Sequence, residues 1–232
     1  MNNSIQHVFF DLDHTLWDFD KNSKLAYEMI FDKYSINQSI DGFLKVYQPI
    51  NMKYWRLYRE EKVTKKELRR GRLIEAFNGL GVSFKNNVID QIADDYIDFL
   101  PLNNYLIDGA KELLEFMAPK YELHIITNGF REVQNAKLVN SGIDKYFRTV
   151  TNSEDAGVKK PNPLIFEQAM IKAKVQSKHC LMIGDSYEAD IVGAEQLGWK
   201  TICFNYHKVE LPERNIQVSQ LSQIKSIMDT MV

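Results

Sequence analysis

Apolar and polar residues change their spacing along the chain in a way that separates two kinds of segment. Residues 7–10 (HVFF) form a short apolar run that ends at an aspartate, as a buried strand does. Residues 20–100 contain no comparable run. Apolar residues recur there at helical spacing in four successive segments, 24–34, 42–58, 65–80 and 87–100. The pattern therefore predicts one strand followed by four helices.

After Pro101 the pattern alternates between strands and helices. Apolar runs predict strands at 122–127, 147–150, 180–184 and 200–205. Helical spacing lies between them at 108–118, 130–142, from 163 onward and at 187–198. Asp108 is expected to cap the first of these helices, and Asn162 the third, with Pro163 in its first turn. Such alternation predicts βαβ units and an α/β fold with a mostly parallel sheet covered on both faces.

The two patterns together predict a split domain. The first strand and the alternating part form one α/β core, residues 1–16 and 104–232, and residues 17–103 form a helical bundle inserted directly after the first strand.

Composition narrows the classes of partner. A net charge of −2 and a pI near 6.2 give no electrostatic case for nucleic acid or an anionic membrane. The start, MNNSIQHVFF, lacks the features of a signal peptide, and no apolar run approaches the roughly 20 residues that span a bilayer. Cys180 and Cys203 lie in apolar runs and are interpreted as small buried hydrophobes, so no disulfide is expected and a cytoplasmic location fits best.

Polar residues gather where the predicted strands end. In open parallel sheets, ligands bind beyond the carboxyl ends of the strands. The residues at those ends and in the loop before residue 163 are Asp11, Asp13, Thr15, Thr127, Asn128, Gly129, Lys159, Lys160, Asp185, Ser186 and Asp190. Clustered carboxylates repel one another, and a divalent cation would neutralise them. Ligands that are all oxygens suit Mg²⁺, so we expect a magnesium site at this edge.

These residues resemble the four motifs of the haloacid dehalogenase (HAD) superfamily. The motifs correspond to DLDHT at 11–15, TN at 127–128, Lys160 before Pro161, and GDSYEAD at 184–190. The resemblance implies a Rossmann-like sheet with the first strand central, a helical cap after that strand, and magnesium-dependent phosphatase activity. Within the superfamily, HTLWDFDKNS and TNGFREVQNAKL resemble the house-cleaning nucleotidases that dephosphorylate pyrimidine nucleotides.

The resemblance also implies roles for the catalytic residues. Asp11 would be the nucleophile, and Asp13 would protonate the leaving group and later activate water. Lys160 would offset the negative charge around Asp11. The metal ligands would be Asp11, Asp13 through its backbone carbonyl, and Asp185, with Asp190 acting through water or by orienting the others. For Asp190, favourable interaction with a helix dipole is an additional explanation.

Residues around the phosphate and the ester group are expected as follows. Thr127, the backbone N–H groups of Asn128 and Gly129, and Lys160 would hold the phosphate oxygens. Trp17 and Phe130 follow motifs directly and would touch a substrate base, although such residues more often serve packing. Thr15 is expected to hold its loop together or to support Asp11.

Other functions are compatible with the same core motifs. A sugar-phosphate phosphatase, a small-metabolite phosphatase or a phosphomutase would carry the same motifs. A non-catalytic binding module is the alternative from a different class; loss of Asp11, Asp13 or Lys160 would favour it, and none is lost. True dehalogenases lack the second aspartate, so Asp13 argues against dehalogenation. The basic and aromatic segment 52–73 is interpreted as a helix with one packed and one solvated face. The expected partner is a small phosphomonoester, with a nucleoside monophosphate favoured.

Overall fold

A computed structural model describes residues 4–231 of the chain. The chain divides into two compact units: a core unit, residues up to Phe19 and from Asn104 onward, and a helical unit, Asp20–Asn103. The boundary expected from the sequence was residue 17, and the structure keeps 17–19 with the core unit. The reason is local, because Trp17 forms isolated β-bridges with Asp13 and with Leu106.

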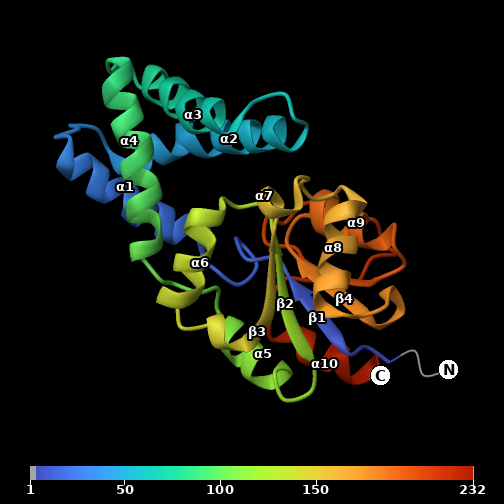
Figure 1. Cartoon of the computed structure of the whole chain (residues 1–232). Coiled ribbons are helices and arrows are strands. Elements are labelled where there is room, and N and C mark those ends of the chain that lie inside the picture. Colours follow the sequence, from blue (N-terminus) through green and yellow to red (C-terminus); the bar gives the residue numbers. More distant parts are fainter. Residues whose placement is uncertain (1–3, 232) are drawn as a thin grey trace. The chain divides into compact units, whose positions relative to one another are not determined.

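The core unit contains one six-stranded parallel sheet. Its strands are β1(His7–Phe10), β2(Glu122–Thr127), β3(Phe147–Asn152), β4(Cys180–Gly184), β5(Lys200–Phe204) and β6(Gln217–Val218). They are arranged in the order β3-β2-β1-β4-β5-β6, and neighbouring strands pair in parallel. Figure 1 labels the first four of these strands. The first strand therefore lies between β2 and β4, as the family resemblance implied, and the α/β prediction is confirmed.

The core unit also contains helices, most of which lie between successive strands. They are α5(Ala110–Met117), α6(Arg131–Asn140), α7(Ser153–Ala156), α8(Pro163–Ala173), α9(Gly193–Glu195) and α10(Gln223–Thr230). Short 3-10 turns lie at Leu100–Leu102, Asp144–Tyr146 and Ser177–His179, and a π-helical turn at Tyr187–Val192. The sequence predicted four of the strands after residue 101 but missed β6, α7 and α10.

The predicted helix caps meet different outcomes. Asn162 does cap α8, since its Oδ1 accepts from the Leu164 N–H at 3.0 Å. The prediction for Asp108 was wrong: the cap of α5 is Gly109, whose φ of 82° lies in the left-handed region that glycine adopts without steric cost.

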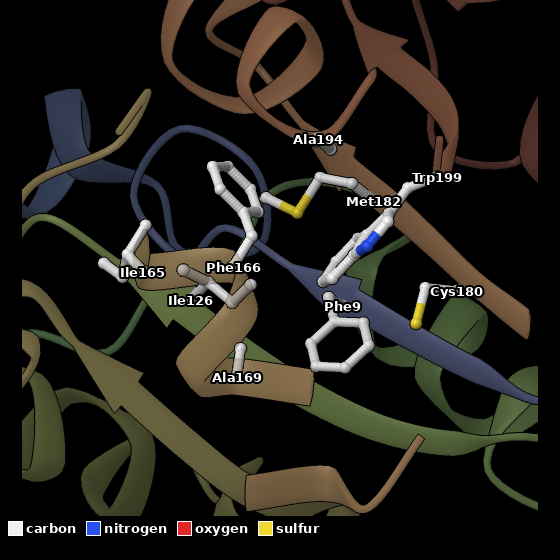
Figure 2. Packing of buried hydrophobic residues seen from close by; sticks show 9 residues of the cluster. All are labelled: Phe9, Ile126, Ile165, Phe166, Ala169, Cys180, Met182, Ala194 and Trp199. Carbon is white, nitrogen blue, oxygen red and sulfur yellow. The ribbon is translucent and has the colours of Figure 1, made fainter. Parts of the chain in front are cut away.

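The sheet is buried on both faces. Val8, Phe9 and Phe10 of β1 are all inaccessible to solvent, although successive side chains of a strand point to opposite faces. On the Phe9 face, residues of α8 and α9 pack over β1, β2 and β4 (Figure 2). The Phe9 and Trp199 rings lie 4.6 Å apart, and Cys180 belongs to the same cluster. Both cysteines are free and buried, as predicted from their apolar surroundings.

The helical unit is built from the four predicted helices. They are α1(Phe19–Lys33), which starts at the last residue of the core unit, α2(Ile40–Arg59), α3(Lys65–Gly79) and α4(Asn86–Phe99). Thr64 and Glu67 form a capping box at the start of α3, each accepting from the other's backbone N–H. None of the helices in the described residues is long and apolar enough to cross a membrane.

Aromatic side chains fill the interior of the helical unit. The Tyr27 ring stacks on Tyr96 at 4.6 Å and meets Tyr47 edge-on at 4.7 Å. Arg72 is buried beside them, 5.0 Å from the centre of the Tyr96 ring, and donates to Asn51 Oδ1 at 2.8 Å. The segment 52–73 thus has its packed face, but that face includes a cation.

Candidate active site

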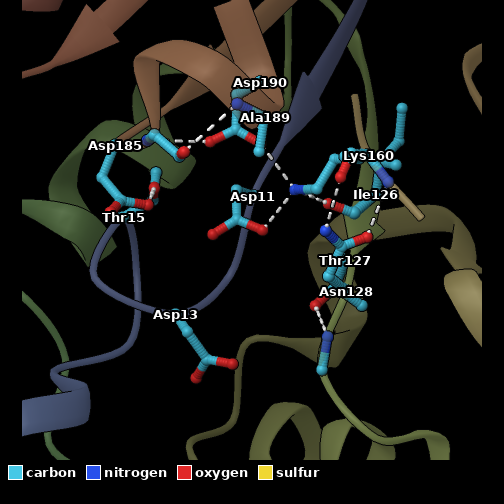
Figure 3. Close-up of polar contacts among 12 residues, drawn as sticks. Asp11, Asp13, Thr15, Ile126, Thr127, Asn128, Lys160, Asp185, Ala189 and Asp190 are labelled. Atoms are coloured by element: carbon cyan, nitrogen blue, oxygen red, sulfur yellow. Dashed lines mark hydrogen bonds and ion pairs between the residues drawn. The ribbon is translucent and has the colours of Figure 1, made fainter. Parts of the chain in front are cut away.

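The ends of three adjacent strands bring the predicted motifs together. β2, β1 and β4 are neighbours, so the residues that follow them, Thr127, Asp11 and Asp185, reach the same edge of the sheet. The Asp11 N–H donates to the Ile183 carbonyl at 2.9 Å, which extends the ladder by one residue and fixes the start of the first loop. Figure 3 shows Asp11 between Lys160 and the pair Asp185 and Asp190, with Asp13 set apart.

Lys160 lies at the centre of this group. Its Nζ is 2.6 Å from Asp11 Oδ1 and 2.6 Å from Asp190 Oδ1, and it donates to the Ile126 carbonyl at 2.7 Å. Burial by itself would lower the pKa of Lys160, but Asp11 and Asp190 raise that pKa above the usual value for lysine. Lys160 is therefore a charged ammonium in the interior, held by two carboxylates and a carbonyl.

The Asn128 side chain fixes the backbone of Lys160. Asn128 Oδ1 accepts from the Lys160 N–H at 2.8 Å, and its Nδ2 donates to the Lys160 carbonyl at 3.0 Å. Both hydrogen-bonding groups of one peptide position are satisfied by one amide, which sets the direction of the lysine side chain (Figure 3).

Three carboxylates lie close to one another at this edge, and two of them contact the lysine. One oxygen from each of Asp11, Asp185 and Asp190 lies within 4.8 Å of the others. Burial, together with mutual repulsion, raises the pKa of Asp11 and of Asp190. For Asp185 burial also acts upward, but the hydrogen bond from His207 and the nearby positive charges lower its pKa. Three acidic groups and one ammonium leave an excess of negative charge, and an all-oxygen set fits a hard dication such as Mg²⁺.

The position of Asp190 depends on a glycine and a π-helical turn. Asp190 Oδ2 accepts from the Ser186 N–H at 3.0 Å, which draws the carboxylate back toward the end of β4. A Cβ on Gly184 would collide with this carboxylate. A glycine at the end of β4 is therefore required for Asp190 to approach the strand end.

Thr15 supports a different carboxylate from the one expected. Its Oγ1 donates to Asp185 Oδ1 at 3.3 Å, linking the first loop to the loop after β4. The sequence interpretation assigned Thr15 to Asp11 or to its own loop. The hydrogen bond in the structure is to Asp185, which follows the neighbouring strand β4.

Asp13 is held apart by two residues that sequence reasoning missed. Lys137 Nζ lies 2.6 Å from Asp13 Oδ1, and Gln134 Nε2 donates to Asp13 Oδ2 at 3.0 Å. Both residues are buried on α6, and Lys137 also stands over the Trp17 ring at 4.3 Å. Their spacing of three places them on one helix face, and this was the available signal.

The predicted phosphate-binding residues lie beside Asp13 and Lys160. Thr127 Oγ1 accepts from the Gly129 N–H at 3.0 Å and from Gln134 Nε2 at 2.6 Å. A Cβ on Gly129 would collide with the Gln134 amide. The Gly129 N–H therefore points to Thr127 in this structure, and its role toward phosphate stays a prediction.

Trp17 and Phe130 are interior residues here. Trp17 is fully buried, and Phe130, the residue before α6, is 4% exposed. Neither ring presents a face to solvent. The Trp17 ring lies under the Lys137 ammonium, so Trp17 contacts the group that holds Asp13.

Comparison with known proteins places this geometry in a family. A family model described as haloacid dehalogenase-like hydrolase matches residues 5–198. Pyrimidine 5'-nucleotidase PynA of Streptococcus pneumoniae is 32% identical over 205 residues, covering 88% of this chain and 85% of that protein. Pyrimidine 5'-nucleotidase YjjG of Escherichia coli is 32% identical over 207 residues, covering 89% and 88%.

A solved structure agrees over the whole length. The crystal structure of the HAD-hydrolase YfnB from Bacillus subtilis, bound to magnesium and showing interdomain movement, superposes with a TM-score of 0.88 at 28% identity. The match covers 97% of this chain and 99% of that one. The matched family model includes the ends of β1, β2 and β4 and the lysine between them, and the chain belongs to the haloacid dehalogenase-like hydrolase family.

Proposed function

We propose that this protein is a magnesium-dependent phosphomonoesterase that acts through a phosphoaspartate on Asp11, with pyrimidine nucleoside 5'-monophosphates as preferred substrates. The observation that carries the proposal is the buried Lys160, which bridges Asp11 and Asp190 at 2.6 Å each beyond the end of β1. A nucleophilic carboxylate needs a neighbouring positive charge to remain ionised and to receive a phosphate dianion. The nucleotide preference is supported by the relatives PynA and YjjG.

In the first step Asp11 attacks phosphorus. A bond forms between a carboxylate oxygen and phosphorus while the bond from phosphorus to the ester oxygen breaks, and Asp13 gives a proton to the departing alkoxide. In the second step Asp13 takes a proton from water, the water oxygen bonds to phosphorus, and the Asp11 carboxylate leaves. Asp13 is restored to its acid form, so one turnover consumes one water molecule.

The metal ligands would be the carboxylates of Asp11 and Asp185, with Asp190 behind them and the Asp13 carbonyl completing the set. When bound, Mg²⁺ supplies charge neutralisation between the nucleophile and the phosphate oxygens. Thr127 and the N–H groups of Asn128 and Gly129 would bind the remaining phosphate oxygens. With phosphate bound, the Gly129 N–H would donate to a phosphate oxygen instead of to the Thr127 hydroxyl.

A panel of phosphomonoesters tests the proposal with phosphate release as the readout. Pyrimidine and purine nucleoside monophosphates, a triose phosphate, a hexose phosphate and nitrophenyl phosphate would be compared with Mg²⁺ and with a chelator. We expect highest kcat/KM for the pyrimidine nucleotides and loss of turnover with chelator. Uniform rates across the panel would contradict the substrate class, and full activity in chelator would contradict the metal requirement.

Two variants test the nucleophile. Asp11→Asn is expected to abolish both turnover and acid-trapped phosphoenzyme, whereas Asp144→Asn, an exposed aspartate of the same unit, is the matched control. Phosphoenzyme forming normally in the Asp11 variant would assign the nucleophile elsewhere.

A further inference from the structure

A second group of potentially metal-ligating side chains also includes Asp185. His14, Asp185 and His207 each offer a ligand atom, and these atoms lie within 4.8 Å of one another. They follow β1, β4 and β5, which are neighbours in the sheet. We propose that these three side chains form a binding site for a transition-metal dication of the Zn²⁺ class, which shares Asp185 with the magnesium site and opposes magnesium binding.

The geometry of the pair His207 and Asp185 suits a shared metal. His207 Nε2 is 3.3 Å from Asp185 Oδ2. That distance is long for a charge-assisted hydrogen bond but equals the edge of a tetrahedron with metal–ligand bonds of about 2 Å. The other oxygen of Asp185, Oδ1, accepts from Thr15 at 3.3 Å, which fixes the carboxylate so that Oδ2 faces the imidazole.

His14 reaches the same place because of its backbone. Its φ of 62° lies in the left-handed region, which turns the chain sharply after Asp13. The His14 ring centre lies 5.0 Å from those of His207, Tyr206 and Phe19. Aromatic neighbours on these sides restrict the imidazole to few orientations, which lowers the cost of ordering it as a ligand.

The chemistry of the donors distinguishes this site from the one formed by Asp11, Asp185 and Asp190. Two imidazole nitrogens and one carboxylate are ligands for Zn²⁺, Co²⁺ or Ni²⁺, whereas Mg²⁺ prefers oxygens only. Two histidines and one carboxylate also leave a fourth position open, as in many zinc sites. Because His207 is 39% exposed, the site can be filled from solvent.

The functional consequence follows from the shared ligand. A carboxylate drawn toward two imidazoles and a dication is less available to a second dication, so each metal weakens the binding of the other by the same factor. Excess zinc would then inhibit the magnesium-supported reaction; this inhibition and the opposition to magnesium binding rest on the proposed function.

Histidine NMR provides the direct test, because the chain contains only five histidines. Zn²⁺ would be added to metal-free protein, and the ring signals followed and assigned with single-histidine variants. We expect the signals of His14 and His207 to shift at stoichiometric zinc and those of the other three to stay. Zinc that moves neither signal would overturn the proposal.

Calorimetry with Zn²⁺ tests the ligand set. His207→Ala and His14→Asn, the latter keeping a residue that tolerates positive φ, are each expected to weaken zinc binding at least about tenfold. His179→Ala, a histidine outside the cluster, is the matched control. Equal affinity in all four proteins would place zinc on the carboxylates alone. Zinc affinity that did not fall as Mg²⁺ was raised would overturn the shared role of Asp185. Neither measurement uses turnover, and the histidine signals and the histidine variants test the zinc site whether or not the proposed magnesium site and activity hold.

Discussion

Two buried cations, one in each unit of the molecule, are stabilised in different ways. Lys160 of the core unit is 2% exposed and is surrounded by the carboxylates of Asp11 and Asp190. Arg72 of the helical unit is 3% exposed and is surrounded by tyrosine rings and the Asn51 amide. Burying a charge is costly in both places, and only the compensating groups differ.

The difference separates a reactive environment from a structural one. The carboxylates beside Lys160 are themselves buried and repel one another, which adds to the cost of burying charge. An additional cation would reduce both costs. This cluster of side chains therefore responds to ligands. Aromatic faces beside Arg72 offset its charge without ionising. Arg72 therefore belongs to the packing of four helices. The comparison predicts that removing Lys160 harms activity most, whereas removing Arg72 harms stability most.

The largest effect is expected from Lys160→Met. Loss of the ammonium leaves Asp11 beside two other carboxylates, which raises its pKa further and removes charge stabilisation of the phosphate. We expect kcat/KM on the best substrate to fall by about 10²–10³-fold or more. A Lys160→Met variant with a rate near that of the wild type would show that the charge of Lys160 is not needed for activity, which would contradict the comparison with Arg72.

Arg72→Met is expected to act on the helical unit instead. The variant loses a charged hydrogen bond and two cation–π contacts, and methionine restores part of the volume. We expect the free energy of unfolding to fall by about 2–3 kcal/mol. Urea unfolding followed by circular dichroism measures this, with Arg56→Met, an exposed arginine of α2, as control. Equal curves for both variants would mean that the buried arginine adds nothing to packing.

Lys137→Met sharpens the comparison within the core unit. Lys137 pairs with Asp13 at 2.6 Å, as Lys160 does with Asp11, but Asp13 is partly exposed and is not surrounded by other carboxylates. We expect a fall in kcat of about 10–100-fold for an alkyl phosphate and a smaller one for nitrophenyl phosphate, whose leaving group needs little protonation. Lys145→Met, an exposed neighbour, is the control. Equal losses on both esters would argue that Lys137 does not act through Asp13.

The smallest effect concerns another buried base, His124, which no acidic side chain of the described residues contacts in a hydrogen bond or ion pair. His124 Nε2 lies 3.0 Å from His7 Nδ1, and His124 Nδ1 lies 2.9 Å from Thr149 Oγ1. The His124 ring stacks on Phe9. Burial, with His7 beside it, lowers the pKa of His124 from 6.5 to about 4. Between these values the unfolded chain binds more protons than the folded one, so acid favours unfolding.

The free energy of unfolding should therefore be constant with respect to this group above pH 6.5 and fall below it. Between pH 6.5 and 5 the loss attributable to His124 is expected to be about 1–2 kcal/mol, and a His124→Gln variant should show a shallower slope. Parallel slopes would show that His124 takes up its proton without cost in the folded state.

Sequence reasoning succeeded where one local pattern determines the structure. β2 and β4 are apolar runs with clear ends, and the residues after them carry the motifs, so both the strands and the site positions followed. It failed for β6, which has only two residues, and for α10, where no pattern was identified. Sequence reasoning also placed the cap of α5 one residue too early, at Asp108. Both this aspartate and the glycine that follows it indicate the start of a helix.

The missed site residues share a cause. Gln134 and Lys137 contact Asp13 across 121 and 124 residues of chain, and His207 meets Asp185 from the next strand. No residue near Lys137 in the sequence indicates that Asp13 is its partner. Likewise the segment 52–73 was expected to pack one face, but only the tyrosines of two other helices reveal that Arg72 lies in it.

The position of β1 has a consequence for how the protein is synthesised. β1 precedes the other strands of the sheet in sequence, yet its register pairs His7 with Glu122 on one side and Cys180 on the other. The helical unit, by contrast, is one continuous stretch of chain, Asp20–Asn103, so its contacts need no residue beyond 103. When residues up to 103 have left the ribosome, β1 has neither of its partner strands, because both lie later in the chain. The acidic edge comes into existence only after β4 has emerged, so β1 must stay protected from other partners for most of translation.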